Sequence, residues 1–106
     1  MNEKRIPNKD QPVYDVDSRG FLMNHGQWDY AFVDKFAGEE GIKELTPIHW
    51  KLIRFARSFY NEHGGSPMPP AYSRFSGMSV RKLYTFFPKG LMSIRRLAGL
   101  PQPRNC

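Results

Sequence analysis

One stretch in the middle of the chain, residues 46–65, constrains the fold more than any other. Thr46-Pro47 is a strong helix start, because threonine accepts hydrogen bonds from free backbone N–H groups and a proline at the first helical position loses no needed donor. Apolar side chains then recur at helical spacing, and His63-Gly64-Gly65 ends the pattern. Few polar residues interrupt the stretch. We therefore expect a long helix at the centre of the fold.

Shorter elements are expected on both sides of this helix. Trp28, Phe32 and Phe36 recur every four residues and predict a helix that ends at Gly38. Ser66 to Pro70 contains three prolines and is expected to be a rigid connector rather than a helix. Three further short helices are expected at 71–75, 80–87 and 91–98.

The N-terminal part of the domain has the pattern of a β-hairpin. Residues 13–16 alternate as a short strand does, residues 17–20 have turn chemistry ending in Gly20, and residues 21–23 return as a second strand. The fold class predicted is α+β but mostly α: a small helical bundle with a helix-turn-helix-like arrangement, this hairpin and a flexible C-terminal arm.

A chain of 106 residues supports one domain. We expect a loose N-terminal arm at 1–11, a single domain at 12–99, and a mobile arm at 100–106, where two prolines forbid a continuing helix. The large apolar residues of the helices are the predicted core: Trp28, Phe32, Phe36, Trp50, Leu52, Phe55, Phe59, Leu83, Tyr84 and Phe87.

Charge is unevenly distributed along the chain. The net charge is +6, yet every acidic residue lies between Glu3 and Glu62, and residues 63–106 carry seven basic side chains and no acidic one. Such asymmetry indicates an anionic partner, either nucleic acid or an acidic protein surface, or else a basic face with no specific ligand. No apolar run is long enough to span a membrane and the polar N-terminus lacks a secretory signal, so a cytoplasmic protein is expected.

Most site chemistries find no support in the sequence. The single cysteine and the three histidines, His25, His49 and His63, have no metal-ligand spacing, and no phosphate-binding glycine loop is present. A catalytic triad needs a base fixed beside its nucleophile, which a cysteine after two prolines does not offer. We predict no metal, no cofactor and no self-contained enzyme active site.

Cys106 is the residue that carries chemistry in this interpretation. Unpaired cysteines are usually buried and inert, but one on a polar, proline-rich arm is expected to be exposed. Arg104, together with Arg95 or Arg96 if the arm folds back, would favour the thiolate, which is the form that attacks sulfur. Persulfide is one of its reversible states. A DNA-binding protein is the main alternative, with residues 80–87 as recognition helix presenting Arg81, Lys82 and Thr85.

The C-terminal residues resemble a known family. Phe87-Pro88-Lys89-Gly90 followed by Leu97-Ala98-Gly99-Leu100-Pro101-Gln102-Pro103-Arg104-Asn105-Cys106 is similar to the ending of the DsrC/TusE family, F-P-x-G followed by I-A-G-L-P-K-P-x-x-C. Residues 17–22, Trp28, residues 40–42, 45–50 and 55–60, and Ser66-Pro67 follow the family's order.

This resemblance implies a mainly helical sulfur-relay protein whose arm cysteine is Cys106. One branch accepts persulfide sulfur from upstream relay proteins and passes it toward the enzyme that 2-thiolates tRNA. Another serves as the gamma-subunit-like partner of dissimilatory sulfite reductase. The first branch is the expected function, the second the alternative, and direct contact of the basic half with nucleic acid is left open.

The chain departs from the family pattern at several points. Arg95 stands where the two-cysteine branch has a second cysteine, so no intramolecular disulfide can form. Pro70 stands where an arginine is usual, the segment between Ser76 and Tyr84 is shorter than in the tRNA branch, and Cys106 is the last residue rather than the next to last. The chain is thus a single-cysteine variant, and its branch is an open question.

Overall fold

The computed structural model describes residues 14–101 of the chain. Its long helix, α2 (Pro47–His63), lies where the sequence predicts it, between Thr46 and Gly64. His49 supports the start of α2: its Nδ1 accepts the Thr46 backbone N–H at 2.9 Å, and its Nε2 lies 2.9 Å from the carbonyl oxygen of Phe86. Because Nδ1 is the acceptor, Nε2 carries the proton and donates it. One buried histidine therefore both caps α2 and ties it to the end of α4.

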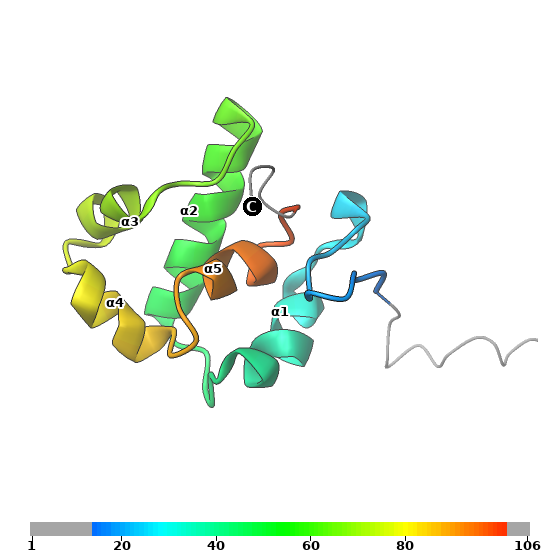
Figure 1. The fold of residues 1–106 in the computed structure, drawn as a ribbon, viewed down its shortest axis with the longest axis horizontal. Coiled ribbons are helices and arrows are strands. Elements are labelled where there is room, and N and C mark those ends of the chain that lie inside the picture. Colours follow the sequence, from blue (N-terminus) through cyan, green and yellow to red (C-terminus); the bar gives the residue numbers. More distant parts are fainter. Residues whose placement is uncertain (1–13, 102–106) are drawn as a thin grey trace, which may run out of the picture.

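The other elements surround α2 (Figure 1). In chain order they are the 3₁₀ helix η1 (His25–Gln27), α1 (Tyr30–Phe36), the 3₁₀ helix η2 (Ala37–Glu40), then α2, α3 (Pro69–Ser76), α4 (Val80–Phe86) and α5 (Met92–Leu97). Helix α5 contacts both α2 and α1, while α3 and α4 pack on each other. Figure 1 shows α1 on one side of the α2–α5 pair and α3 and α4 on the other.

The predicted connector, residues 66–70, is wrong in its last two residues. Pro69 and Pro70 form the first turn of α3, where their missing N–H groups would have had no helical partner in any case. Residues 66–68 remain outside the helix.

The predicted N-terminal β-hairpin is also wrong: within residues 14–101 there is no strand, only a single antiparallel bridge between Val16 and Leu22. The turn itself forms, with the Asp17 N–H donating to the Phe21 carbonyl at 2.9 Å. Pairing goes no further because the Asp15 N–H donates to the Gln27 side chain at 2.9 Å. The chain then turns into η1. Side-chain contacts with η1 have replaced the rest of the ladder.

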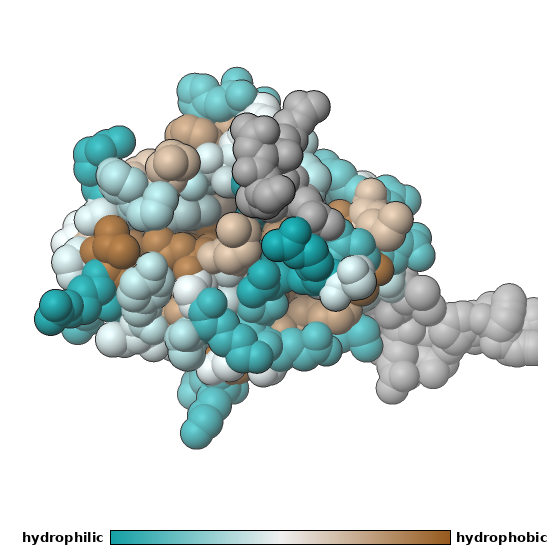
Figure 2. Space-filling model, viewed as in Figure 1, coloured by the Kyte–Doolittle hydropathy of each residue, from teal (hydrophilic) through white to brown (hydrophobic). Residues whose placement is uncertain are grey.

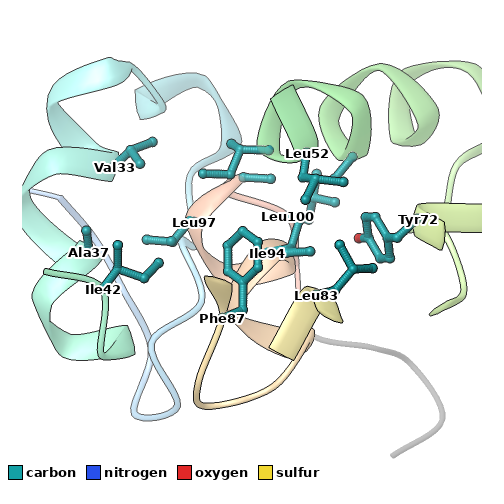
Figure 3. Close-up of a cluster of buried hydrophobic side chains, with 13 residues drawn as sticks. Val33, Ala37, Ile42, Leu52, Tyr72, Leu83, Phe87, Ile94, Leu97 and Leu100 are labelled. Atoms are coloured by element: carbon teal, nitrogen blue, oxygen red, sulfur yellow. The ribbon is translucent and has the colours of Figure 1, made fainter. Parts of the chain in front are cut away.

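The core lies where α5 meets its neighbours (Figure 3). Leu97, Ile94 and Leu100 are fully buried between the α1 side, represented by Val33, and the α2–α4 side, represented by Leu52. Four of the predicted core residues are fully buried as expected: Phe32, Leu52, Leu83 and Phe87. Four more, Trp28, Phe36, Trp50 and Phe55, are partly buried and pack against the core.

Two predicted core residues differ. Phe59 is only half-buried, and Tyr84 is wrongly assigned to the core because 49% of its surface is exposed. The position of Tyr84 one residue after the buried Leu83 turns it outward on the short helix α4.

No helix among the described residues is long and apolar enough to cross a membrane.

Candidate functional site

The C-terminal arm leaves the domain through a closely packed root, residues 97–101, directly after α5. Leu97, Ala98 and Leu100 are fully buried. Gly99 has φ of +72°, a conformation open to glycine, and a Cβ built on it would stand 2.6 Å from Cδ1 of Trp28. Only glycine fits here, which gives the Ala-Gly-Leu-Pro run a physical reason.

Three successive carbonyl oxygens of the root accept hydrogen bonds from side chains of earlier elements. Trp28 Nε1 donates to the Leu97 carbonyl at 2.7 Å, and Arg57 donates to the Ala98 carbonyl at 2.8 Å. His25 Nδ1 lies 3.1 Å from the Gly99 carbonyl, which requires the proton on Nδ1. The last carbonyls of a helix have no partner within it, and here three separate side chains supply one to each.

Arg57 and Trp28 also support one another. The Arg57 guanidinium lies 4.1 Å from the centre of the Trp28 ring, within the range of a cation–π contact. Burial lowers the pKa of Arg57 from its ordinary value. The pair holds the root from two directions, since Trp28 precedes α1 and Arg57 lies on α2.

Arg95 holds the next step of the chain. Its Nε donates to the Pro101 carbonyl at 2.6 Å, and its terminal nitrogen donates to Ser66 Oγ. The same arginine lines a pocket of about 280 Å³ between the start of α3 and α5. The pocket is mostly apolar; its walls are Ser66, Pro67, Met68, Pro69, Tyr72, Leu91, Met92 and Arg95.

Arg96 faces a different part of the fold. Its Nε and a terminal nitrogen each lie 2.8 Å from the two carboxylate oxygens of Glu40, and Ser93 donates to the same carboxylate at 2.6 Å. Burial opposes ionisation of Glu40, but the hydrogen bonds from Arg96 and Ser93 and the charges of Arg96 and Lys89 outweigh it, so the pKa of Glu40 lies below its usual value. This bidentate pair joins α5 to η2.

The predicted site residues thus fall into three groups. Arg95 lies at the arm root, Arg96 is engaged with Glu40, and Arg104 and Cys106 lie outside the described residues. The predicted arm, 100–106, begins with a residue that the structure buries: Leu100 is part of the core.

The sequence did not identify three of the side chains that lie at the root: Arg57, His25 and Ser66. In the sequence, Arg57 is one of the few polar residues of the long helix, His25 is a histidine without metal-ligand spacing, and Ser66 begins the predicted connector. The one available signal was Arg57, a cation inside an otherwise apolar stretch, and it did not indicate which group Arg57 would contact. Within residues 14–101 no group of three histidine, cysteine or acidic residues could hold a metal ion.

Comparison with known proteins agrees with this geometry. The model of the family described as "DsrC like protein" matches residues 8–106. The sulfurtransferase TusE of Yersinia pseudotuberculosis is 39% identical over 103 residues, covering 89% of this chain and 94% of that protein. The dissimilatory-type sulfite reductase gamma subunit of Nitratidesulfovibrio vulgaris is 33% identical over 94 residues, covering 88% of this chain and 90% of that subunit.

Solved structures of similar proteins share the fold. The oxidised gamma-subunit of dissimilatory sulfite reductase (DsrC) from Archaeoglobus fulgidus aligns with a TM-score of 0.80 at 28% identity, covering 88% of this chain and 91% of that one. A chain in the crystal structure of dissimilatory sulfite reductase I (DsrI) aligns with a TM-score of 0.79 at 33% identity, covering 88% and 90%.

The DNA-binding alternative gains no support from these comparisons. Arg81, Lys82 and Thr85 are exposed on α4, but the relatives found are sulfurtransferases and sulfite reductase subunits. The family match over nearly the whole chain, and the relatives of both kinds, lead to one conclusion: this chain is a member of the DsrC family of DsrC-like proteins, together with the TusE sulfurtransferases.

Proposed function

We propose that this protein is a sulfur carrier that accepts sulfur as a persulfide on Cys106 and passes it to a partner enzyme, as in the synthesis of 2-thiouridine in tRNA. The observation that carries the proposal is the structure of the arm root, which lies immediately before the segment that bears the cysteine. No residue other than glycine fits at position 99, and side chains donate hydrogen bonds to four backbone carbonyls of the root. A carrier needs its reactive group at a defined reach from the domain, and a fixed root defines that reach.

The transfer needs no cofactor. The Cys106 thiolate attacks the outer sulfur of a persulfide on a donor protein's cysteine; a new S–S bond forms at Cys106, the donor's S–S bond breaks, and the donor cysteine leaves as a thiolate. The proton of the donor persulfide stays with the transferred sulfur or is lost to solvent. At the acceptor, a cysteine thiolate of the partner enzyme attacks the outer sulfur of the Cys106 persulfide, the S–S bond at Cys106 breaks, and Cys106 leaves as a thiolate. No net oxidation or reduction occurs at either step.

Among the described residues, Arg95 is the one that we propose acts on the charge state of Cys106. Its guanidinium contacts Pro101, the last residue that the structure describes. A cation near a thiol or persulfide stabilises the anion and lowers its pKa. Arg104 adds charge two residues before Cys106 in the sequence. Arg96, whose guanidinium is engaged by Glu40, we assign to the fold instead.

A sulfite-reductase partner role is the second candidate, favoured by the 33% identity to a gamma subunit. Against it stands Arg95 in place of a second cysteine, which removes the internal disulfide on which that chemistry depends. We propose the upstream relay proteins as sulfur donors and a tRNA-thiolating enzyme as acceptor.

Intact mass spectrometry tests the carrier function directly. The full-length protein is incubated with a cysteine desulfurase, cysteine and an upstream persulfide-carrying relay protein. We expect a gain of one sulfur, about 32 Da, that reduction with dithiothreitol removes. Cys106→Ser should gain none while its thermal unfolding is unchanged. An equal mass gain in Cys106→Ser would refute the assignment of the cysteine.

The role of Arg95 is tested by the pH dependence of Cys106 alkylation with iodoacetamide. Arg95→Glu should move the midpoint of the rate profile to higher pH, because a carboxylate replaces the cation beside the arm. Arg81→Glu makes the same change of charge on α4, away from Pro101, and is the matched control. Superimposable profiles for the two variants would remove Arg95 from the mechanism.

A further inference from the structure

Apart from Arg95, the pocket between α3 and α5 takes no part in the mechanism just proposed, yet it lies at the arm root. Arg95 both lines the pocket and donates to the Pro101 carbonyl. Its floor is apolar, and two methionines at its rim are exposed, Met68 at 70% and Met92 at 41%. A cavity of about 150 Å³ already holds a benzene-sized group, so a pocket of about 280 Å³ accommodates a large apolar side chain.

Chain length keeps any partner of Cys106 near the arm root, where this pocket lies. Cys106 is the fifth residue after Pro101, and an extended chain spans at most about 3.6 Å per residue, so Cys106 stays within roughly 18 Å of Pro101. A sulfur-transfer partner whose own cysteine must meet Cys106 therefore has to place its surface against the arm root. Interfaces of this kind involve about 20–30 residues on each partner, whereas only five residues follow Pro101.

The chemistry around the pocket specifies that surface. Residues 63–106 contain no aspartate or glutamate, so no acidic side chain lines the pocket, and the only charge in its lining is that of Arg95. Methionine and arginine are enriched in protein–protein interfaces, and Figure 2 shows apolar surface between the α3–α4 side of the molecule and α5.

We infer that this pocket is the docking site of the sulfur-transfer partner, and that the occupant is an apolar side chain that projects from an acidic patch of the partner protein. The inference rests on the proposed function, because it takes Cys106 as the point of transfer. Docking here holds the partner by contacts outside the arm. The arm then has only to deliver the sulfur.

Met68→Asp tests the inference, with Met23→Asp as its matched control. Both methionines are 70% exposed, but only Met68 lines the pocket. Met68 is the N-cap residue of α3 and has no side-chain capping bond, so aspartate there is compatible with the fold, and as a good N-cap it should not lower stability. It does place a carboxylate where an acidic, apolar partner surface would dock.

The measurement is the rate of sulfur gain on Cys106 of the full-length protein from two donors. One donor is an upstream relay protein loaded with persulfide by a cysteine desulfurase; the other is inorganic polysulfide, which needs no docking surface. Met68→Asp should slow transfer from the protein donor about tenfold or more and leave the polysulfide rate unchanged. Met23→Asp should change neither rate. Circular dichroism and thermal unfolding verify that both variants fold, and Met92→Asp repeats the test at a second rim position.

Three other outcomes would contradict the docking site, and a fourth would contradict the carrier function. Equal rates for Met68→Asp and Met23→Asp with the protein donor would overturn the docking site. Slower transfer from both donors in Met68→Asp would mean that the pocket seats the chain's own arm, which also overturns it. A tRNA affinity that falls in Met68→Asp but not in Met23→Asp would give the surface to RNA instead. Failure of the unmodified protein to gain sulfur from either donor would refute the carrier function itself, separately from the docking site.

Discussion

Replacing Gly99 with alanine should destabilise the fold far more than its size suggests. At φ of +72° a Cβ costs about 1–2 kcal/mol in backbone strain. The new Cβ would also stand 2.6 Å from Trp28 Cδ1, so the indole must move. That movement weakens its hydrogen bond to Leu97, worth about 1 kcal/mol, and its contact with Arg57, worth about 0.5–1 kcal/mol. The total is roughly 2.5–4 kcal/mol.

Gly64→Ala isolates the part that comes from the clash. Gly64 also ends a helix, with φ of +76°, and a Cβ there meets nothing within 4 Å. Urea unfolding of both variants should give an additional loss of about 1.5–2 kcal/mol for Gly99→Ala. The corresponding additional fall in Tm is about 6–16 °C, since a domain of this size loses about 4–8 °C per kcal/mol. Near-ultraviolet circular dichroism should show the altered tryptophan environment in Gly99→Ala alone. Equal losses in the two variants would refute the argument that Trp28 encloses Gly99.

Three further predictions concern the arm root and the Glu40–Arg96 pair. Leu100→Ala should cost about 2–4 kcal/mol in urea unfolding, because Leu100 is fully buried; a loss below about 0.5 kcal/mol would place it in the arm after all. Trp28→Phe keeps a ring but loses the Nε1 donor to Leu97, so the free energy of unfolding should fall by about 1 kcal/mol, and an unchanged value would contradict that bond. The lowered pKa of Glu40 means that its stabilisation is present above its unfolded pKa and disappears as the pH falls through its folded pKa. Glu40→Gln should therefore lose about 1.5–3 kcal/mol at pH 7, because its hydrogen bonds with Arg96 lose their charge. It should also show weaker acid dependence than the parent, and parallel stability–pH curves would refute this.

The helices were largely predictable because their signals are local. Thr46-Pro47 and Gly64 fixed both ends of α2, since a cap and a stop residue act within one turn. The hairpin was not predictable in the same way. The alternating pattern of residues 13–23 is what a strand pair requires, but Gln27, on a later element, takes the N–H that would have extended the ladder. A tertiary contact decided the outcome.

The candidate site, too, was predictable only where its signals are local in the sequence. The sequence pointed to Cys106 and Arg95 from position and charge alone, and Arg95 does lie at the arm root. It could not distinguish Arg95 from its neighbour Arg96. The two are adjacent in the sequence, yet on a helix adjacent residues point about 100° apart, so one reaches Pro101 and the other reaches Glu40. Arg57 contacts a carbonyl about 40 residues later in the chain, and His25 contacts one about 70 residues later. No local sequence pattern encodes such contacts.

The hydrogen bonds of the root have a consequence for how this chain can diverge over evolution. Their acceptors are backbone carbonyls, which every residue possesses, whereas their donors are particular side chains: Trp28, Arg57 and His25. Mutations at the accepting positions leave the bonds intact as long as the new side chain fits, and Gly99 is the exception. Purifying selection on the geometry of the arm should therefore act most strongly on residues remote from the arm in sequence. The tail motif contains the acceptors of these hydrogen bonds but not their donors.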